Sequence, residues 1–104
     1  MPEGPELLYS AIYFKKMLSK AYMTNIEAFT YNAVSLPKDT NGKILDIDVK
    51  GKLLWFQLQN NYYVHIHFGI TGWLDFEKPQ KNIKYILTFR KDKKQLSLYM
   101  EDER

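Results

Sequence analysis

The hydrophobic pattern changes once along the 104-residue chain, from a helical period to a strand period. Between residues 5 and 20, apolar side chains recur at helical spacing, which predicts an amphipathic helix. Pro5 suits the first turn of that helix, and we interpret Lys15, Lys16 and Lys20 as its solvated polar face. The apolar stripe consists of Leu7, Leu8, Ala11, Ile12, Phe14, Met17 and Leu18.

From Met23 onward apolar and polar residues alternate, which is typical of half-buried strands. Asn60-Asn61 can adopt the positive φ angles of a tight turn. The expected strands are 45–50, 53–59, 62–68, 73–77, 83–90 and 95–100, and 30–41 is expected to be a connecting loop. We assign the strand aromatics to the core, since aromatic residues on alternating strands usually pack there. They are Trp55, Phe56, Phe68, Trp73, Tyr85 and Phe89.

One helix followed by six or seven short antiparallel strands predicts a mainly β fold of the α+β class. The architecture expected is a two-sheet antiparallel β-sandwich with the N-terminal amphipathic helix at its side. The length allows one domain, and a hydrophobic fraction of 45% with 15% aromatic residues argues against disorder.

Charge and cysteine content narrow the classes of function. A net charge of +3 favours an anionic partner, although proteins that bind none can carry a similar charge. The absence of cysteine excludes disulfides and thiolate metal sites. No apolar run is long enough to span a membrane, and Glu3 and Glu6 stand where a secretory signal would carry basic residues. We therefore expect a soluble, intracellular protein.

The first six residues carry the strongest chemical signal. If Met1 is removed, Pro2 becomes a secondary amine flanked by Glu3 and Glu6. An α-amino group has a reference pKa of about 7.7 to 8, so much of it is neutral near neutral pH. Such an amine can attack an electrophilic sugar carbon and form a Schiff base.

Four motifs, in order along the chain, resemble those of the formamidopyrimidine-DNA glycosylase and endonuclease VIII family. They are Pro2-Glu3-Gly4-Pro5-Glu6, Gly51-Lys52-Leu53-Leu54, His67-Phe68-Gly69-Ile70-Thr71-Gly72 and Asp102-Glu103-Arg104. Gly4 is closer to the endonuclease VIII branch. The family's N-terminal domain is a two-layered β-sandwich flanked by helices, which agrees with the fold predicted from the pattern.

The resemblance implies a base-excision repair DNA glycosylase that also cleaves abasic sites by β,δ-elimination and acts on oxidised bases. Residues 1–104 would be its N-terminal catalytic domain, truncated before the Phe of the family's Asp-Pro-Arg-Arg-Phe-Gly loop. The family's helix-two-turns-helix and finger domains would be absent, and zinc, where the family has it, lies in that finger. We therefore expect no cofactor in this chain, damaged double-stranded DNA as its partner, and no membrane.

The family's catalytic roles transfer to the N-terminal motif. Pro2 would attack C1′, Glu3 would be the general acid and base, and Glu6 would support the amine. An acid in a first helical turn is also favoured by the helix dipole, whatever its function.

The family's DNA contacts transfer to four further positions. Lys52 would grip a phosphate beside the lesion and assist catalysis, and His67 would contact backbone phosphate. Ile70 stands in the place of a Met that fills the hole left by the flipped base, and Arg104 would face the orphaned base. Without the resemblance, Lys52 would be an ordinary turn lysine. His65 and His67 share one strand face, a spacing that also permits metal binding, but no third ligand is evident.

Two alternatives remain from the sequence. The chain could be a non-catalytic DNA-binding or interaction remnant of such an enzyme, because fold does not fix function. It could also be a β-sandwich with no nucleic-acid role, whose motif matches are accidental.

Overall fold

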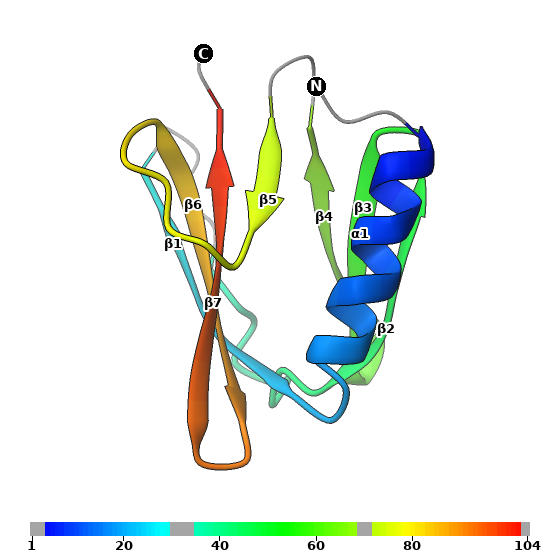
Figure 1. The fold of residues 1–104 in the computed structure, drawn as a ribbon. Coiled ribbons are helices and arrows are strands. Elements are labelled where there is room, and N and C mark those ends of the chain that lie inside the picture. The colour runs from blue at the N-terminus through cyan, green and yellow to red at the C-terminus, as the bar shows by residue number, and fades with distance from the viewer. Residues whose placement is uncertain (1–3, 30–34, 69–71, 103–104) are drawn as a thin grey trace.

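Two antiparallel sheets face each other in the computed structural model, which describes residues 4–29, 35–68 and 72–102 and, within these, side chains from Leu7 onward (Figure 1). The elements in chain order are α1 (Gly4–Met17), β1 (Tyr22–Ala28), β2 (Ile44–Lys50), β3 (Leu53–Leu58), η1 (Gln59–Asn61), β4 (Tyr62–His67), β5 (Trp73–Asp75), β6 (Ile83–Lys91) and β7 (Lys94–Glu101). One sheet has the order β1-β6-β7-β5 and the other the order β2-β3-β4. The predicted two-sheet sandwich is confirmed.

The strands lie close to the ranges that the alternation predicts. The exception is β1, for which the alternation predicted only an onset near Met23 and no range. Among the strands with a predicted range, the largest difference is β5, which ends at Asp75, two residues earlier than expected. The turn at Asn60 and Asn61 has φ angles of 68° and 62°, which confirms the predicted positive-φ turn. Asp92, at the tip of the β6–β7 hairpin, has a φ of 56°, a conformation that Asn and Asp adopt more readily than most residues.

Helix α1 ends at Met17, three residues before the predicted end. Lys20, with a φ of 64°, lies in the left-handed region that continues no helix. The Lys91 ammonium donates a hydrogen bond to the Met17 carbonyl oxygen over 3.1 Å, and so satisfies one of the carbonyls that a helix end leaves unpaired. No helix in the described ranges has both the length and the apolar character needed to cross a membrane.

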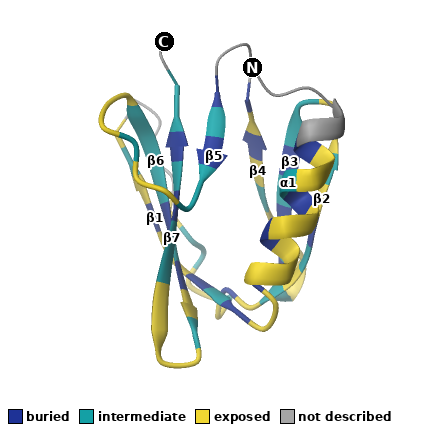
Figure 2. Cartoon of the chain, viewed as in Figure 1, coloured by how far each residue is buried: buried dark blue, intermediate teal, exposed yellow. Residues whose placement is uncertain are grey.

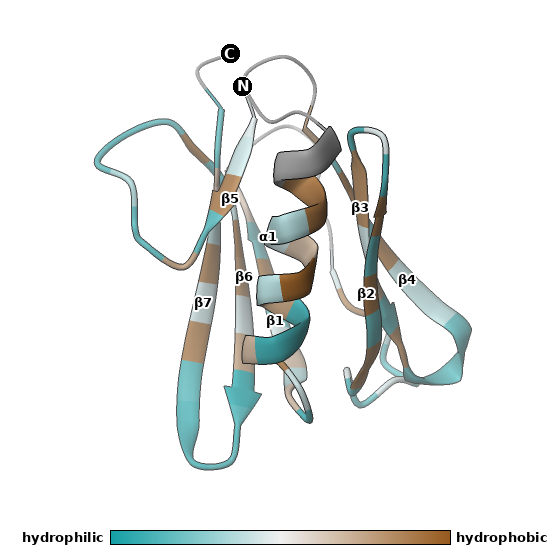
Figure 3. Cartoon of the chain, turned by 45° about the vertical axis from the view of Figure 1, so that its right-hand side comes forward, coloured by the Kyte–Doolittle hydropathy of each residue, from teal (hydrophilic) through white to brown (hydrophobic). Residues whose placement is uncertain are grey.

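The faces of α1 differ from the prediction. Its buried residues are Leu7, Ala11 and Phe14, and Leu18, directly after the helix end, is buried as well. Leu8, Ile12 and Met17, which were expected in the buried stripe, are exposed (Figure 2). The helix packs against β2 at the side of the sandwich and therefore buries only one narrow arc (Figure 3). The amphipathic prediction was wrong for these three residues, because α1 is apolar on its outer side as well.

The core lies between the sheets, and none of its described buried side chains is polar. Phe56 from one sheet meets Phe89 from the other, with ring centroids 5.8 Å apart. Phe68 is also buried, so the core assignment is confirmed for these three. Trp55 and Trp73 are only half-buried, because they alternate with the buried Leu54, Phe56 and Leu74 and so point to the other face of their sheets. Tyr85, also half-buried, packs against the core.

Candidate functional site

Lys52 and His67 lie beside each other at one end of the three-stranded sheet. Leu53 pairs with His67 across β3 and β4, and the Phe68 backbone N–H donates to the Lys52 carbonyl over 3.1 Å. Gly51 has a φ of 61° in the β2–β3 turn that presents Lys52, a conformation that glycine adopts at no steric cost. Two of the predicted phosphate-contacting residues are therefore neighbours, although fifteen positions separate them in sequence.

The first turn of α1 lies at the same end of the sandwich as the β2–β3 turn and the end of β4 (Figure 1). Glu6 is in that turn, although its side chain is outside the described part of the structure. Pro2, Glu3, Ile70 and Arg104 also lie outside the described residues. The structure thus places Lys52, His67 and the start of α1 at Gly4 at the same end of the sandwich.

A backbone hydrogen bond joins Phe68 and Gly72, the described residues on either side of positions 69–71. The Gly72 N–H donates to the Phe68 carbonyl over 2.9 Å, and both residues are buried. A Cβ added at Gly72 would lie 2.3 Å from that carbonyl oxygen, which is closer than real Cβ atoms come. Glycine is therefore required at position 72 by the close approach of its backbone to that of Phe68, which is buried in the core.

The groups with shifted pKa values lie away from this end. The Lys15 ammonium donates to Asp46 Oδ1 over 2.7 Å, and this hydrogen bond lowers the pKa of the Asp46 carboxyl and raises the pKa of Lys15. The Tyr62 hydroxyl donates to Asp39 Oδ1 over 2.5 Å, which raises the pKa of Tyr62. Each pair connects a helix or a loop to the three-stranded sheet. We interpret both pairs as structural.

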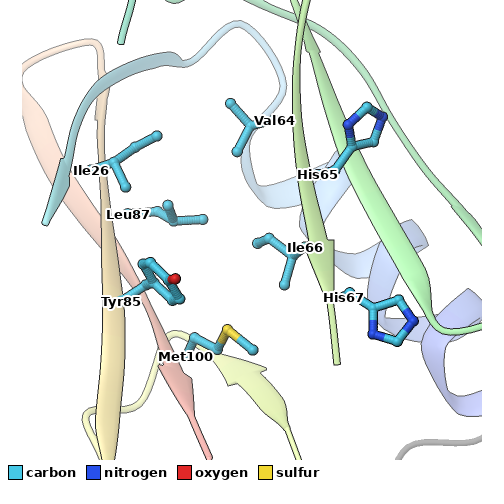
Figure 4. A pocket seen from close by; sticks show the side chains of 8 residues that line it. All are labelled: Ile26, Val64, His65, Ile66, His67, Tyr85, Leu87 and Met100. Carbon is cyan, nitrogen blue, oxygen red and sulfur yellow. The ribbon is translucent and has the colours of Figure 1, made fainter. Parts of the chain in front are cut away.

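The histidine pair on β4 faces away from the space between the sheets. A pocket of about 260 Å³ opens there, into which Ile26, Val64, Ile66 and Leu87 point, whereas His65 and His67 point outward (Figure 4). The described residues contain no group of three or more His, Cys, Asp or Glu placed to hold a metal ion. The apolar pocket lacks the charges that phosphate binding requires, so the outer face and the sheet end are the better candidates for a nucleic-acid site.

Sequence reasoning missed an aromatic group on the outer face of the three-stranded sheet. The His65 ring lies 6.1 Å from that of Tyr63 and 6.4 Å from that of Trp55, measured between centroids. Strict alternation along β3 would have placed Trp55 on the other face of the strand from Leu54 and Phe56. The sequence therefore already indicated that Trp55 lies on the outer face. The aromatic group adjoins His67 on the same face of β4.

The β-sandwich, its flanking helix and the neighbouring Lys52 and His67 define a small α+β domain with two basic candidate residues side by side at one end. Comparison with known proteins identifies the family. The family model described as the formamidopyrimidine-DNA glycosylase N-terminal domain matches residues 1–104. The chain belongs to this family, which confirms the resemblance in the sequence; the match does not distinguish the endonuclease VIII branch.

Solved structures show the same fold. The MutM (Fpg) protein from Thermus thermophilus superposes with a TM-score of 0.79 over 99% of this chain, at 23% identity. An inhibited LlFpg in complex with DNA containing N7-benzyl-Fapy-dG gives 0.78 over 99%, at 21% identity. A complex of LlFpg with THF-DNA and an inhibitor gives 0.76 over 97%, also at 21% identity. This chain spans only 37–41% of the length of these proteins. A search of curated proteins found no match.

Proposed function

We propose that this chain is the N-terminal catalytic domain of a base-excision repair DNA glycosylase with abasic-site lyase activity, encompassing residues 1–104. The observation that carries the proposal is the juxtaposition of Lys52 and His67 at the end of the sandwich where α1 begins. Membership of the family supports it, because the family model matches residues 1–104, a range that includes Lys52, His67 and Pro2.

The proposed chemistry begins at the nitrogen of Pro2, after removal of Met1. The nitrogen lone pair forms a bond to C1′ of the damaged nucleotide, the C1′–base bond breaks, and the nitrogen loses its proton. The C1′–O4′ bond then opens as Glu3 protonates the ring oxygen O4′, and the nitrogen lone pair forms the C1′=N double bond of the iminium. The resulting iminium withdraws electrons and so acidifies the C2′ proton. Loss of this proton expels the 3′-phosphate, a second elimination expels the 5′-phosphate, and water releases the sugar from Pro2.

The remaining residues hold the DNA in this proposal. Lys52 and His67 would bind phosphates next to the lesion. They are distant in sequence, and the pairing of β3 with β4 makes them neighbours. Ile70 would fill the space that the flipped nucleotide leaves, and Arg104 would face the unpaired partner base. Glu6 would support the amine. The partner would be damaged double-stranded DNA, with no cofactor in this chain.

We propose the endonuclease VIII branch, and hence oxidised pyrimidines and abasic sites as substrates, on the basis of Gly4. The chain spans 37–41% of the matched structures, so on its own it would make fewer phosphate contacts and turn over slowly. If it proves inactive, the alternative is a DNA-binding remnant of such an enzyme.

Borohydride reduction tests the proposal, because it converts the iminium to a stable covalent adduct. Processed protein, with Met1 removed as verified by mass spectrometry, is incubated with a duplex that contains an abasic site. A covalent complex through Pro2 is expected, and protein that retains Met1, in which the Pro2 nitrogen is an amide, is the matched control that cannot form it at that position. If neither the processed chain nor a fusion of it to the family's other domains is trapped, the enzyme assignment is wrong.

A further inference from the structure

Basic residues are concentrated at the end of the molecule opposite to the proposed catalytic end. The helix end and the β6–β7 hairpin, residues 15–20 and 90–94, contain seven of the 15 Lys and Arg residues but only one of the 12 acidic residues. Figure 3 shows the tip of the β6–β7 hairpin as hydrophilic, and it shows hydrophilic positions beside apolar ones at the end of α1. Like charges gathered from two distant segments repel one another in the folded state, so the arrangement requires an explanation.

A groove separates these two segments. Its volume is about 630 Å³, and Met17 and Leu96 contribute apolar side chains to it. The other lining residues are Lys16, Lys91, Asp92, Lys93 and Lys94. We call these seven residues the basic groove.

Some of the charges near the basic groove have structural partners. Lys15 pairs with Asp46, Lys91 caps the helix end at Met17, and the Arg90 guanidinium lies 4.9 Å from the centre of the Tyr22 ring. The helix dipole favours a cation at this end, and Lys91 already supplies one.

Lys16, Lys93 and Lys94 have no such role. All three are exposed, and they have neither an ion pair nor a side-chain hydrogen bond with the residues that the structure describes. Three exposed ammonium groups around one groove, with a single carboxylate, suit a run of phosphates better than a single small anion.

We propose that the basic groove is a second binding site for the phosphate backbone of duplex DNA, separate from the lesion site. The choice of DNA among polyanions rests on the proposed function. Helix α1 has 14 residues and is therefore about 21 Å long, so the two sites are separated by about six base pairs at 3.4 Å each. The groove would hold undamaged DNA, independently of sequence, because lysine reads phosphate charge and not base edges.

Removal of the three uncommitted charges tests this inference. The variant K16Q/K93Q/K94Q is compared with K16R/K93R/K94R, which keeps the charges, in salt titrations with an undamaged duplex of about two helical turns. Each lost phosphate contact lowers the slope of log affinity against log salt by about 0.9, so we expect a slope reduced by about 2 to 3 and at least tenfold weaker binding of the Gln variant at low salt. The Arg variant should retain the wild-type slope. A Gln variant that is folded and keeps that slope overturns the inference.

A measurement on the wild-type chain removes any dependence on how the variants fold. Acetylation of Lys16, Lys93 and Lys94 is followed by mass spectrometry with and without the same duplex, and we expect the DNA to slow it several-fold. Unchanged acetylation of these lysines contradicts the site. Polyglutamate is the specificity control, because it is a polyanion that carries no phosphate. Protection by polyglutamate equal to that by DNA would overturn the nucleic-acid assignment.

The two proposals fail separately. Salt titration and acetylation use undamaged DNA and do not depend on Pro2, whereas borohydride trapping needs the amine and an abasic site. Trapping with an unchanged slope for K16Q/K93Q/K94Q would leave the glycosylase proposal intact and remove the basic groove as a DNA site. A reduced slope without trapping would leave the basic groove as a DNA site and remove the glycosylase proposal.

Discussion

The backbone N–H of Phe68 donates a hydrogen bond to the carbonyl of Lys52 over 3.1 Å, which extends the pairing of β3 and β4 to the end of the sheet. Because Phe68 is buried and Lys52 follows a tight turn, this bond fixes the backbone on both sides of the proposed phosphate site. His67 precedes Phe68 and is thereby held beside Lys52. The proposed DNA contacts thus depend on a rigid strand end.

Replacement of Lys52 should weaken DNA binding without unfolding the protein. We expect Lys52→Ala to lower the slope of log affinity against log salt by about 1, since one phosphate contact is lost. Lys50→Ala removes the same charge from the exposed end of β2 and is the control, with a smaller expected change. Equal slopes for Lys52→Ala and wild type would show that Lys52 holds no phosphate.

Gly72 should tolerate no side chain. Gly72→Ala places a Cβ 2.3 Å from the Phe68 carbonyl oxygen, and relief of this clash requires backbone movement. We expect the free energy of unfolding to fall by about 1 to 3 kcal/mol, measured by urea denaturation. Gly51→Ala has open space around its Cβ but a φ of 61°, so it should cost only about 1 kcal/mol. A smaller loss for Gly72→Ala than for Gly51→Ala would contradict the close approach.

The contact between Phe56 and Phe89 should dominate the stability of the sandwich. Phe56 is fully buried, so Phe56→Ala removes a large side chain and leaves a cavity. The expected loss is about 3 to 5 kcal/mol in urea unfolding. Tyr9→Ala, at a residue that is 72% exposed, should change stability by no more than about 0.5 kcal/mol. Similar losses in the free energy of unfolding for Phe56→Ala and Tyr9→Ala would contradict the assignment of Phe56 to the core.

The Lys15–Asp46 pair should contribute a pH-dependent stability. The hydrogen bond from Lys15 lowers the pKa of Asp46, so its contribution is complete above the unfolded-state pKa of about 3.9 and is lost as the pH falls through the lowered folded pKa. The pair also raises the pKa of Lys15. Its contribution to stability through Lys15 is complete below the unfolded-state pKa of about 10.4 and is lost as the pH rises through the folded-state pKa.

The variant Asp46→Asn measures this contribution by urea unfolding at several pH values. The free energy of unfolding of Asp46→Asn should fall below that of the wild type most between pH values of about 3.9 and 10.4. The difference should shrink at high salt, because the side chains of Lys15 and Asp46 are 62% and 38% exposed. Glu27→Gln, on an exposed position of β1, controls for the lost charge. A deficit that persists unchanged below both the folded and the unfolded pKa of Asp46 would have another cause.

Alternation alone predicted most of the fold, because each strand has one face against the core. Leu54, Phe56 and Leu58 are buried at every second position of β3, as the pattern requires. Helix α1 was harder to predict, since its outer side is apolar as well as its inner side. Leu7 and Leu8 have the same side chain, and only the position of the helix at the side of the sandwich decides which one is buried.

The candidate site was predictable only in part from the sequence. Family motifs identified Lys52 and His67, but their proximity follows from the register of β3 and β4, which is not encoded in either motif. The basic groove was not predicted, because Lys16 and Lys94 come together only through tertiary packing. From the sequence alone, the helix lysines were assigned to a solvated face.

The central claim is that the nitrogen of Pro2 forms the covalent intermediate, and peptide mapping of the borohydride-reduced complex tests it most directly. After digestion of the trapped protein and DNA, mass spectrometry should find the sugar remnant on the N-terminal peptide, attached to Pro2, with no Met1 before it. A remnant attached to a lysine, or an N-terminal peptide that stays unmodified in the trapped complex, would contradict the account.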